Sequence, residues 1–336
     1  MTGPILNDSP PAEAVGNDTN ALAAMREQFL DPETGQVRWG DVIPAILGLI
    51  SEIDPGLELS SLSRVSTSSN YRGLLEEISK DVGRTMVATE RESGVGVAMV
   101  IPDGEMNILA VDTGILENLF DPDVAVMLTT LNLLHHELAH VHDGAVKRRN
   151  LPDVWMKRRL EGWSCYTNRI AQGAWDEYYA ERRSYPTLPR GESLHIPMLE
   201  AEIPKTAQAI RNVVAAHRPD CSMDSLIPAV FEEVRFLFQL AGYALGTLAA
   251  AEKPLEEVHA GAATVLRASS FGRHWDSLAE HLDLLWRTHG AWPDGEIFAP
   301  VEAMVLTTLK ELGVVLTVKA DGGLWVEVLY DFGKAS

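Results

Sequence analysis

An apolar helical run that carries two histidines and a glutamate constrains this chain more than any other feature. Residues 133–141 read Leu-Leu-His-His-Glu-Leu-Ala-His-Val and contain the pattern H-E-x-x-H. His136 and His140 are four residues apart, so in a helix they lie on one face and can bind a single metal ion. Glu137 would lie beside that metal, where its carboxylate can accept a proton from water. The pattern predicts the core of a zinc hydrolase.

The residues around the motif predict where its helix begins and ends. Asp121 can cap free backbone N–H groups, and Pro122 suits the first helical position. Gly144 predicts the end of the helix, because glycine readily adopts the left-handed conformation found there. The motif would then lie in the last turns of the helix. His135 and His142 point in other directions on the same helix and have no metal-ligand spacing, so we expect them beside the ligands or at the surface.

A catalytic zinc ion needs a third protein ligand and an open position for water. The metzincin pattern requires His or Asp at position 146, where this chain has Val146. Asp143 follows His140 on the same helix and would hardly reach the third corner of the metal, so we expect it to cap the helix or to pair locally. A carboxylate on a second helix is the remaining option. Residues 160–183 are helix-compatible, with a bend expected near Gly173.

Within this second helix, two glutamates are placed to face the first. Glu177 and Glu181 are four residues apart and share a face, and Ala180 between them permits close helix packing. Glu177 would bind zinc, and Glu181 would accept a hydrogen bond from a ligand imidazole. Glu161 is the alternative third ligand.

The combination of H-E-L-A-H with E-x-x-A-[DE]-R resembles the gluzincin metallopeptidases, especially their HtpX-like and ImmA/IrrE-like groups. The resemblance covers about residues 70–185. It implies a zincin-like core and maps the third zinc ligand of those families onto Glu177. The acidic residue four positions later is usually Asp in those families, and this chain has Glu181 there.

Two β-rich segments precede the motif. Residues 94–101 and 107–112 flank the turn-forming residues 102–105 and predict a hairpin. In zincins, an edge strand just before the metal helix binds extended substrate by strand addition. The resemblance therefore predicts a peptide or protein substrate, with one zinc ion per chain.

The expected chemistry is peptide hydrolysis with Glu137 as general base. Such a reaction also needs a group that stabilises the developing oxyanion. Tyr178, Tyr179 and His195 are the candidates, by their nearness in sequence to Glu177. The alternative function is a regulatory or scaffold protein that keeps the zincin fold, turns over little substrate and binds a partner with its C-terminal half. An intermediate possibility is a peptidase dedicated to one regulatory protein.

The expected fold class is α+β and predominantly helical. Three regions are predicted: a disordered tail over 1–20, a zincin-like catalytic domain with N-terminal helices over 21–190, and a helical cap or interaction region over 191–336. Further predicted elements are two helical patterns within 21–53, helices near 71–86, 198–217, 224–252, 254–268, 272–289 and 298–312, and a C-terminal hairpin of strands 314–319 and 324–328.

Composition bears mainly on partners and compartment. The formal net charge of -20 argues against nucleic acid and anionic membranes as partners. The two cysteines, Cys165 and Cys221, do not suggest a disulfide framework, and the first residues lack the pattern of a signal peptide. The apolar segment 236–251 is shorter than a membrane span needs, and its glycines, Gly242 and Gly246, favour close helix contact instead. We therefore expect a cytoplasmic protein that does not insert into a membrane.

Overall fold

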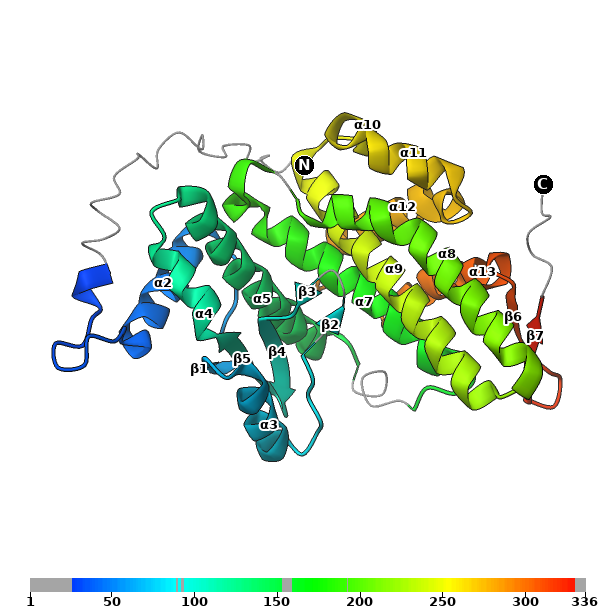
Figure 1. Cartoon of the computed structure of the whole chain (residues 1–336), viewed down its shortest axis with the longest axis horizontal. Helices are drawn as coiled ribbons and strands as arrows, with labels where there is room; N and C mark the ends of the chain where they lie inside the picture. The colour runs from blue at the N-terminus through cyan, green and yellow to red at the C-terminus, as the bar shows by residue number, and fades with distance from the viewer. Residues whose placement is uncertain (1–25, 89, 92–93, 153–158, 192, 330–336) are drawn as a thin grey trace.

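The computed structural model describes residues 26–88, 90–91, 94–152, 159–191 and 193–329. Figure 1 shows a sheet-containing part joined to a larger helical part. The predicted tail over 1–20 lies outside the described residues. The prediction of a predominantly helical α+β chain is confirmed.

The sheet-containing part comes first in the chain. Its elements are α2 (Trp39–Ile53), β1 (Leu62–Ser68), α3 (Tyr71–Val82), β2 (Glu90–Arg91), β3 (Gly94–Val95), β4 (Ala98–Asp103), β5 (Met106–Asp112), α4 (Thr113–Leu116), the 3-10 turn η2 (Glu117–Phe120) and α5 (Val124–Asn150).

The helical part follows α5. Its elements are α7 (Ser164–Ser184), the 3-10 turns η3 (Tyr185–Thr187) and η4 (Pro189–Gly191), α8 (His195–Asp220), α9 (Met223–Ala251), α10 (Leu255–Val258), α11 (Ala260–Ala268), η5 (Phe271–His274), α12 (Trp275–Arg287), η6 (Gly295–Phe298), α13 (Ala299–Glu311), β6 (Val314–Val318) and β7 (Leu324–Val328). The predicted C-terminal hairpin is confirmed by the antiparallel pairing of β6 and β7.

The main sheet has three strands in the order β1-β5-β4. The predicted hairpin is confirmed, because β4 and β5 pair antiparallel with Val100 opposite Leu109. Its first strand begins at Ala98 rather than at residue 94, because Gly94–Val95 pairs with β2 instead. Strand β1 pairs parallel to β5 and was not predicted, since its sequence Leu-Ser-Arg-Val-Ser-Thr-Ser has few apolar residues. Among the described residues β4 forms one edge of this sheet, and helix α5 packs against it.

Helix α5 differs from its predicted bounds at both ends. Asp123 caps it by accepting a hydrogen bond from the N–H of Ala125, so Asp121 and Pro122 precede the cap. At the other end the helix continues through Gly144 to Asn150. The predicted stop was wrong because Val146 and Lys147 of the next turn are buried, and their packing favours continued helix. The motif therefore lies inside the helix rather than in its last turns.

The second predicted helix corresponds to α7, which begins four residues later than the expected start at residue 160 and runs through Gly173 to Ser184. The predicted helix over 254–268 is two helices, α10 and α11, because the backbone at His259 is extended, with φ −153° and ψ 90°.

Two glycines bring α7 and α9 into backbone contact. A Cβ atom on Gly242 would lie 2.3 Å from the carbonyl oxygen of Ala174, and one on Gly246 would lie 2.5 Å from that of Tyr178. The predicted close helix contact is therefore confirmed. Helix α9 has 29 residues, so the predicted short segment is part of a longer helix that could cross a membrane by length and composition, although 67% of its most apolar window is buried in the protein.

The two parts have separate hydrophobic cores. Side chains of α2, β5 and α5 form one core, including Ile50, Val111 and Leu138. The larger core unites α7 with the helices that follow it, including Trp175 and Phe238. Helix α7 thus packs with the region beyond residue 190, which was predicted to be a helical cap or interaction region.

Candidate metal centre

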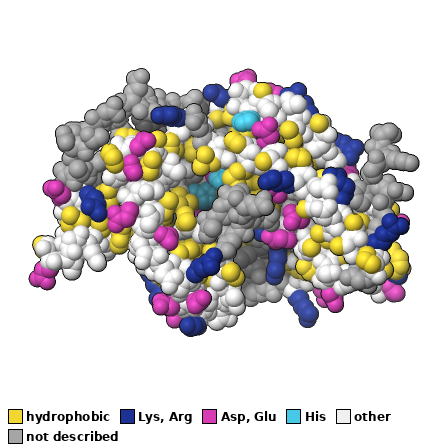
Figure 2. All heavy atoms as spheres, in the orientation of Figure 1, with side chains coloured by type: hydrophobic (Ala, Val, Ile, Leu, Met, Phe, Trp, Pro, Cys, Tyr) yellow, Lys and Arg dark blue, Asp and Glu magenta, His cyan; other side chains and the backbone are white. Residues whose placement is uncertain are grey.

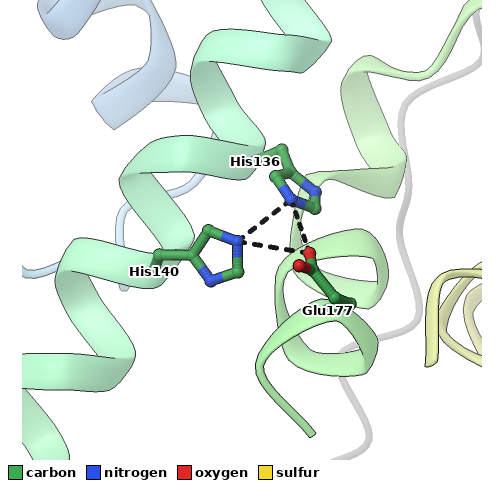
Figure 3. Close-up of side chains that lie close together, drawn as sticks. All are labelled: His136, His140 and Glu177. Atoms are coloured by element: carbon green, nitrogen blue, oxygen red, sulfur yellow. Dashed lines mark hydrogen bonds and ion pairs between the residues drawn. The ribbon is translucent and has the colours of Figure 1, made fainter. Parts of the chain in front are cut away.

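The two histidines of the motif and Glu177 converge between α5 and α7 (Figure 3). The Nε2 atoms of His136 and His140 lie 3.1 Å apart. The Oε2 atom of Glu177 lies 3.2 Å from Nε2 of His136 and 3.4 Å from Nε2 of His140. The spacing of the motif and the packing of α7 on α5 together produce this cluster.

The donor atoms fit a tetrahedral ion. Zinc binds imidazole nitrogen and carboxylate oxygen at about 2.0–2.2 Å, which places neighbouring ligand atoms roughly 3.3 Å apart. The three distances in the cluster, 3.1, 3.2 and 3.4 Å, are close to that value. His136 and Glu177 are buried and His140 is half-buried, so the group could hold a metal ion. Histidine side chains lie in a recess near the middle of the face shown in Figure 2.

The cluster carries a proton that metal binding would displace. Burial lowers the pKa of His140, but the hydrogen bond to the Glu177 carboxylate outweighs this effect and raises it to about 9. Burial raises the pKa of Glu177, but its bonds to the two histidines bring it well below its usual range. A metal ion binds the neutral imidazole, so its binding would release the proton.

Glu137 lies beside the cluster at the edge of the sheet. It is buried, and this burial raises the pKa of its carboxyl group, while the nearby His140 and His136 partly offset the effect. The backbone N–H of Val100 in β4 donates a hydrogen bond to the carboxylate. The packing of α5 on β4 therefore places the predicted base beside the edge strand.

Helix α9 supplies a further part of the site. Nε2 of Gln239 donates to Oε1 of Glu177 at 2.6 Å, and the hydroxyl of Tyr243 is hydrogen-bonded to the same carboxylate. Burial raises the pKa of Tyr243 well above its usual value, and the neighbouring Glu177 adds to the shift. Sequence reasoning missed both residues. The available signal was the polar series Gln239, Tyr243 and Thr247, spaced by four on an otherwise apolar helix.

Glu181 lies near Nδ1 of His136, at a distance longer than the predicted hydrogen bond. Its Oε1 atom is 3.6 Å from Nδ1 of His136 and 3.1 Å from Nδ1 of His195. Its other oxygen accepts a hydrogen bond from the Thr247 hydroxyl at 3.2 Å. Burial raises the pKa of Glu181, but the adjacent His195 outweighs it and the pKa is lowered.

The three candidate oxyanion stabilisers have different surroundings. His195 stacks on Tyr243, with 3.9 Å between ring centroids, and so lies beside the cluster. Tyr178 and Tyr179 are buried, and their hydroxyls accept hydrogen bonds from Arg182 at 2.6 Å and Arg183 at 3.3 Å. The prediction for these two tyrosines is wrong, because neighbours of Glu177 in sequence point to other sides of α7.

Glu161, the alternative ligand, is exposed in the turn before α7 and is not part of the cluster.

The remaining polar residues of α5 stabilise the fold around the site. His135 is fully buried and lies 3.2 Å from the Thr187 hydroxyl. Nδ1 of His142 accepts a hydrogen bond from the Glu58 N–H at 2.8 Å, and burial lowers the pKa of His142 to about 4. Neither histidine is at the surface.

Asp143 pairs locally, as expected. Its carboxylate lies 2.7 Å from Nζ of Lys147 and 2.9 Å from Nε2 of His289. The second contact ties α5 to the segment after α12.

Comparisons with known proteins give no relative for this chain: no family model, no curated protein and no solved structure matches it. The geometry of the site is therefore the basis for assigning a function.

Proposed function

We propose that this chain is a zinc-dependent peptidase of the gluzincin type. The observation that supports the proposal is the convergence of His136, His140 and Glu177, with Glu137 beside them. Two imidazoles and one carboxylate form a donor set that catalytic zinc sites use, and they leave a position open for substrate. A site that served structure alone would not need a buried carboxyl group next to the ligands.

Each residue of the site has its own role in the proposed reaction. His136, His140 and Glu177 would hold the ion, while Gln239 orients the Glu177 carboxylate from its other oxygen. A zinc ion held there would supply Lewis-acid chemistry, acidifying water and polarising a carbonyl group. Glu137 takes a proton from the attacking water and passes it to the leaving amine. Its raised pKa suits this role, because a proton taken up in the first step must remain bound until the second.

The position of the sheet suggests how a peptide would bind. Strand β4 is an edge strand among the described residues, and its Val100 N–H already contacts Glu137. An extended peptide that pairs with β4 would place its backbone beside the general base. We therefore propose an unfolded or locally extended segment of a peptide or protein as the substrate.

The test compares wild type with Glu137→Gln, which keeps the shape of the side chain and removes the base. Metal analysis is expected to find one zinc ion per chain in both proteins. A proteome-wide cleavage screen is expected to find peptides cut by wild type, at a rate about 10³-fold above that of the variant. If the two proteins produce the same cleavage pattern, or if neither cleaves anything, the peptidase proposal is wrong and the non-catalytic alternative is favoured.

A further inference from the structure

Tyr243 lies beside two histidines at the edge of the metal cluster. Its ring is inclined by 22° to that of His136, at a centroid distance of 5.6 Å. It also stacks on His195 at 3.9 Å and 21°. Its hydroxyl is hydrogen-bonded to Glu177, whose Oε2 lies within 3.4 Å of both ligand histidines. The O–H group is therefore one hydrogen bond from the point where the donor atoms converge.

The position of this ring is fixed by its surroundings. Glu181 lies 3.1 Å from Nδ1 of His195 and accepts a hydrogen bond from Thr247, which is one turn beyond Tyr243 on α9. The backbone contact at Gly242 sets the distance of α9 from α7. A donor held in place in this way stabilises developing charge without the cost of reorganisation that water would pay.

We propose that Tyr243 is a catalytic residue, whose O–H group donates a hydrogen bond to the carbonyl oxygen of the scissile peptide as that oxygen gains negative charge. The tyrosine keeps its proton throughout: the proton removed from water goes to Glu137 and then to the leaving amine. His195 is a positioning residue that holds the ring. This inference rests on the proposed peptidase function.

A different role for Tyr243 would be to orient Glu177, as Gln239 does. The two roles predict different results for Tyr243→Phe, which keeps the stacked ring and removes the hydroxyl. Loss of an orienting group weakens zinc binding, and activity falls with it. Loss of a donor to the reacting oxygen lowers kcat at full zinc occupancy and leaves KM nearly unchanged.

The matched control is Tyr178→Phe. The Tyr178 hydroxyl is also buried and hydrogen-bonded, but its partner is Arg182 and it is not in contact with the cluster. This variant is expected to keep the kcat, KM and zinc affinity of wild type.

The experiment uses the full zinc-loaded chain and a peptide from the cleavage screen. For Tyr243→Phe we expect kcat at saturating zinc to fall about 100-fold or more, with KM within about threefold of wild type. Calorimetry with a phosphinic analogue of N-acetyl-Ala-Ala, whose tetrahedral phosphorus resembles the reacting carbon, is expected to show about 100-fold weaker binding to the variant.

An unchanged kcat, or a loss of zinc affinity that accounts for the whole loss of activity, would overturn the role of Tyr243. If wild type and Glu137→Gln cleave the same peptides, the peptidase proposal has failed. The affinities of wild type and Tyr243→Phe for the phosphinic analogue then still test whether Tyr243 donates a hydrogen bond. Equal affinity of wild type and Tyr243→Phe for the analogue, including no measurable binding by either, overturns the proposal.

Discussion

The sheet-containing part and the helical part contribute different things to the metal centre, and helix α5 is where they meet. On the sheet side, Leu134 and Leu138 of α5 pack into the core with α2 and β5, and β4 provides a backbone N–H to Glu137. On the helical side, α7 and α9 provide Glu177, Glu181, Gln239 and Tyr243. The sheet side thus positions Glu137, the proposed general base, and the helical side supplies Glu177, a proposed metal ligand, and the groups around it.

The region beyond residue 190 therefore forms part of the candidate site. It was expected to form a cap or to bind a partner, yet its Gln239 donates a hydrogen bond to Glu177, a proposed metal ligand. Helix α9 is apolar enough to resemble a membrane span, but its polar face is turned toward Glu177 and Glu181.

The largest effect is expected from removing Glu177, the proposed metal ligand that the helical part provides. Glu177→Gln keeps the size of the side chain and removes its charge, so the zinc Kd is expected to rise more than about 100-fold. Competition with a chelator of known affinity measures it. The control is Glu161→Gln, which changes an exposed glutamate and is expected to leave the Kd unchanged. Equal zinc binding by wild type and Glu177→Gln would mean that α5 holds the metal without the helical part.

A second test moves α9 away from α7 without changing a proposed metal ligand. In Gly242→Ala the new methyl group would lie 2.3 Å from a backbone oxygen of α7, so the helices must move apart. We expect the free energy of unfolding to fall by about 2–3 kcal/mol, with weaker zinc binding. On the sheet side, Gly48→Ala in α2 meets nothing within 4 Å and is expected to stabilise the chain by about 0.5–1 kcal/mol. Urea unfolding of both variants measures the contrast, and equal effects would show that the close contact is unimportant.

A third and smaller effect concerns the ion pair that joins the end of α2 to α7. Asp54 lies 2.6 Å from Nε of Arg183 and 3.4 Å from Nε2 of His135. Burial raises the pKa of Asp54, but these two partners outweigh it and lower the pKa to about 2. Because the folded-state pKa is below the unfolded value, the stabilisation is present above about pH 4 and is lost as the pH falls toward 2.

Asp54→Asn is therefore expected to lower the free energy of unfolding by about 2 kcal/mol at pH 7. The difference from wild type should shrink between about pH 4 and pH 2, which unfolding in urea at several pH values can follow. A difference that stays constant with pH would mean that the ionised carboxylate contributes nothing through this pair.

Predictions from the sequence succeeded where they concerned residues close together in one helix or one hairpin. The four-residue spacing of His136 and His140 determines their common face once the segment is helical. The hairpin of β4 and β5 likewise follows from two β-rich apolar segments around a short turn. Nearness in sequence was a poor guide to the surroundings of Glu177, because Tyr178 and Tyr179 lie about 100° and 200° around α7 from it.

Local sequence was enough to predict the helix with its two histidines and Glu137, and the spacing that makes Glu177 and Glu181 share a face. The contacts of Gln239 and Tyr243 with Glu177, and the position of Glu161 away from the cluster, follow from the packing of the helices. The physical reason is that these contacts depend on how closely α7 and α9 approach, which the backbone contacts at Gly242 and Gly246 set. The helical period determines the direction in which each side chain points from its own helix. The distance between two helices is set by the side chains and glycines at their contact.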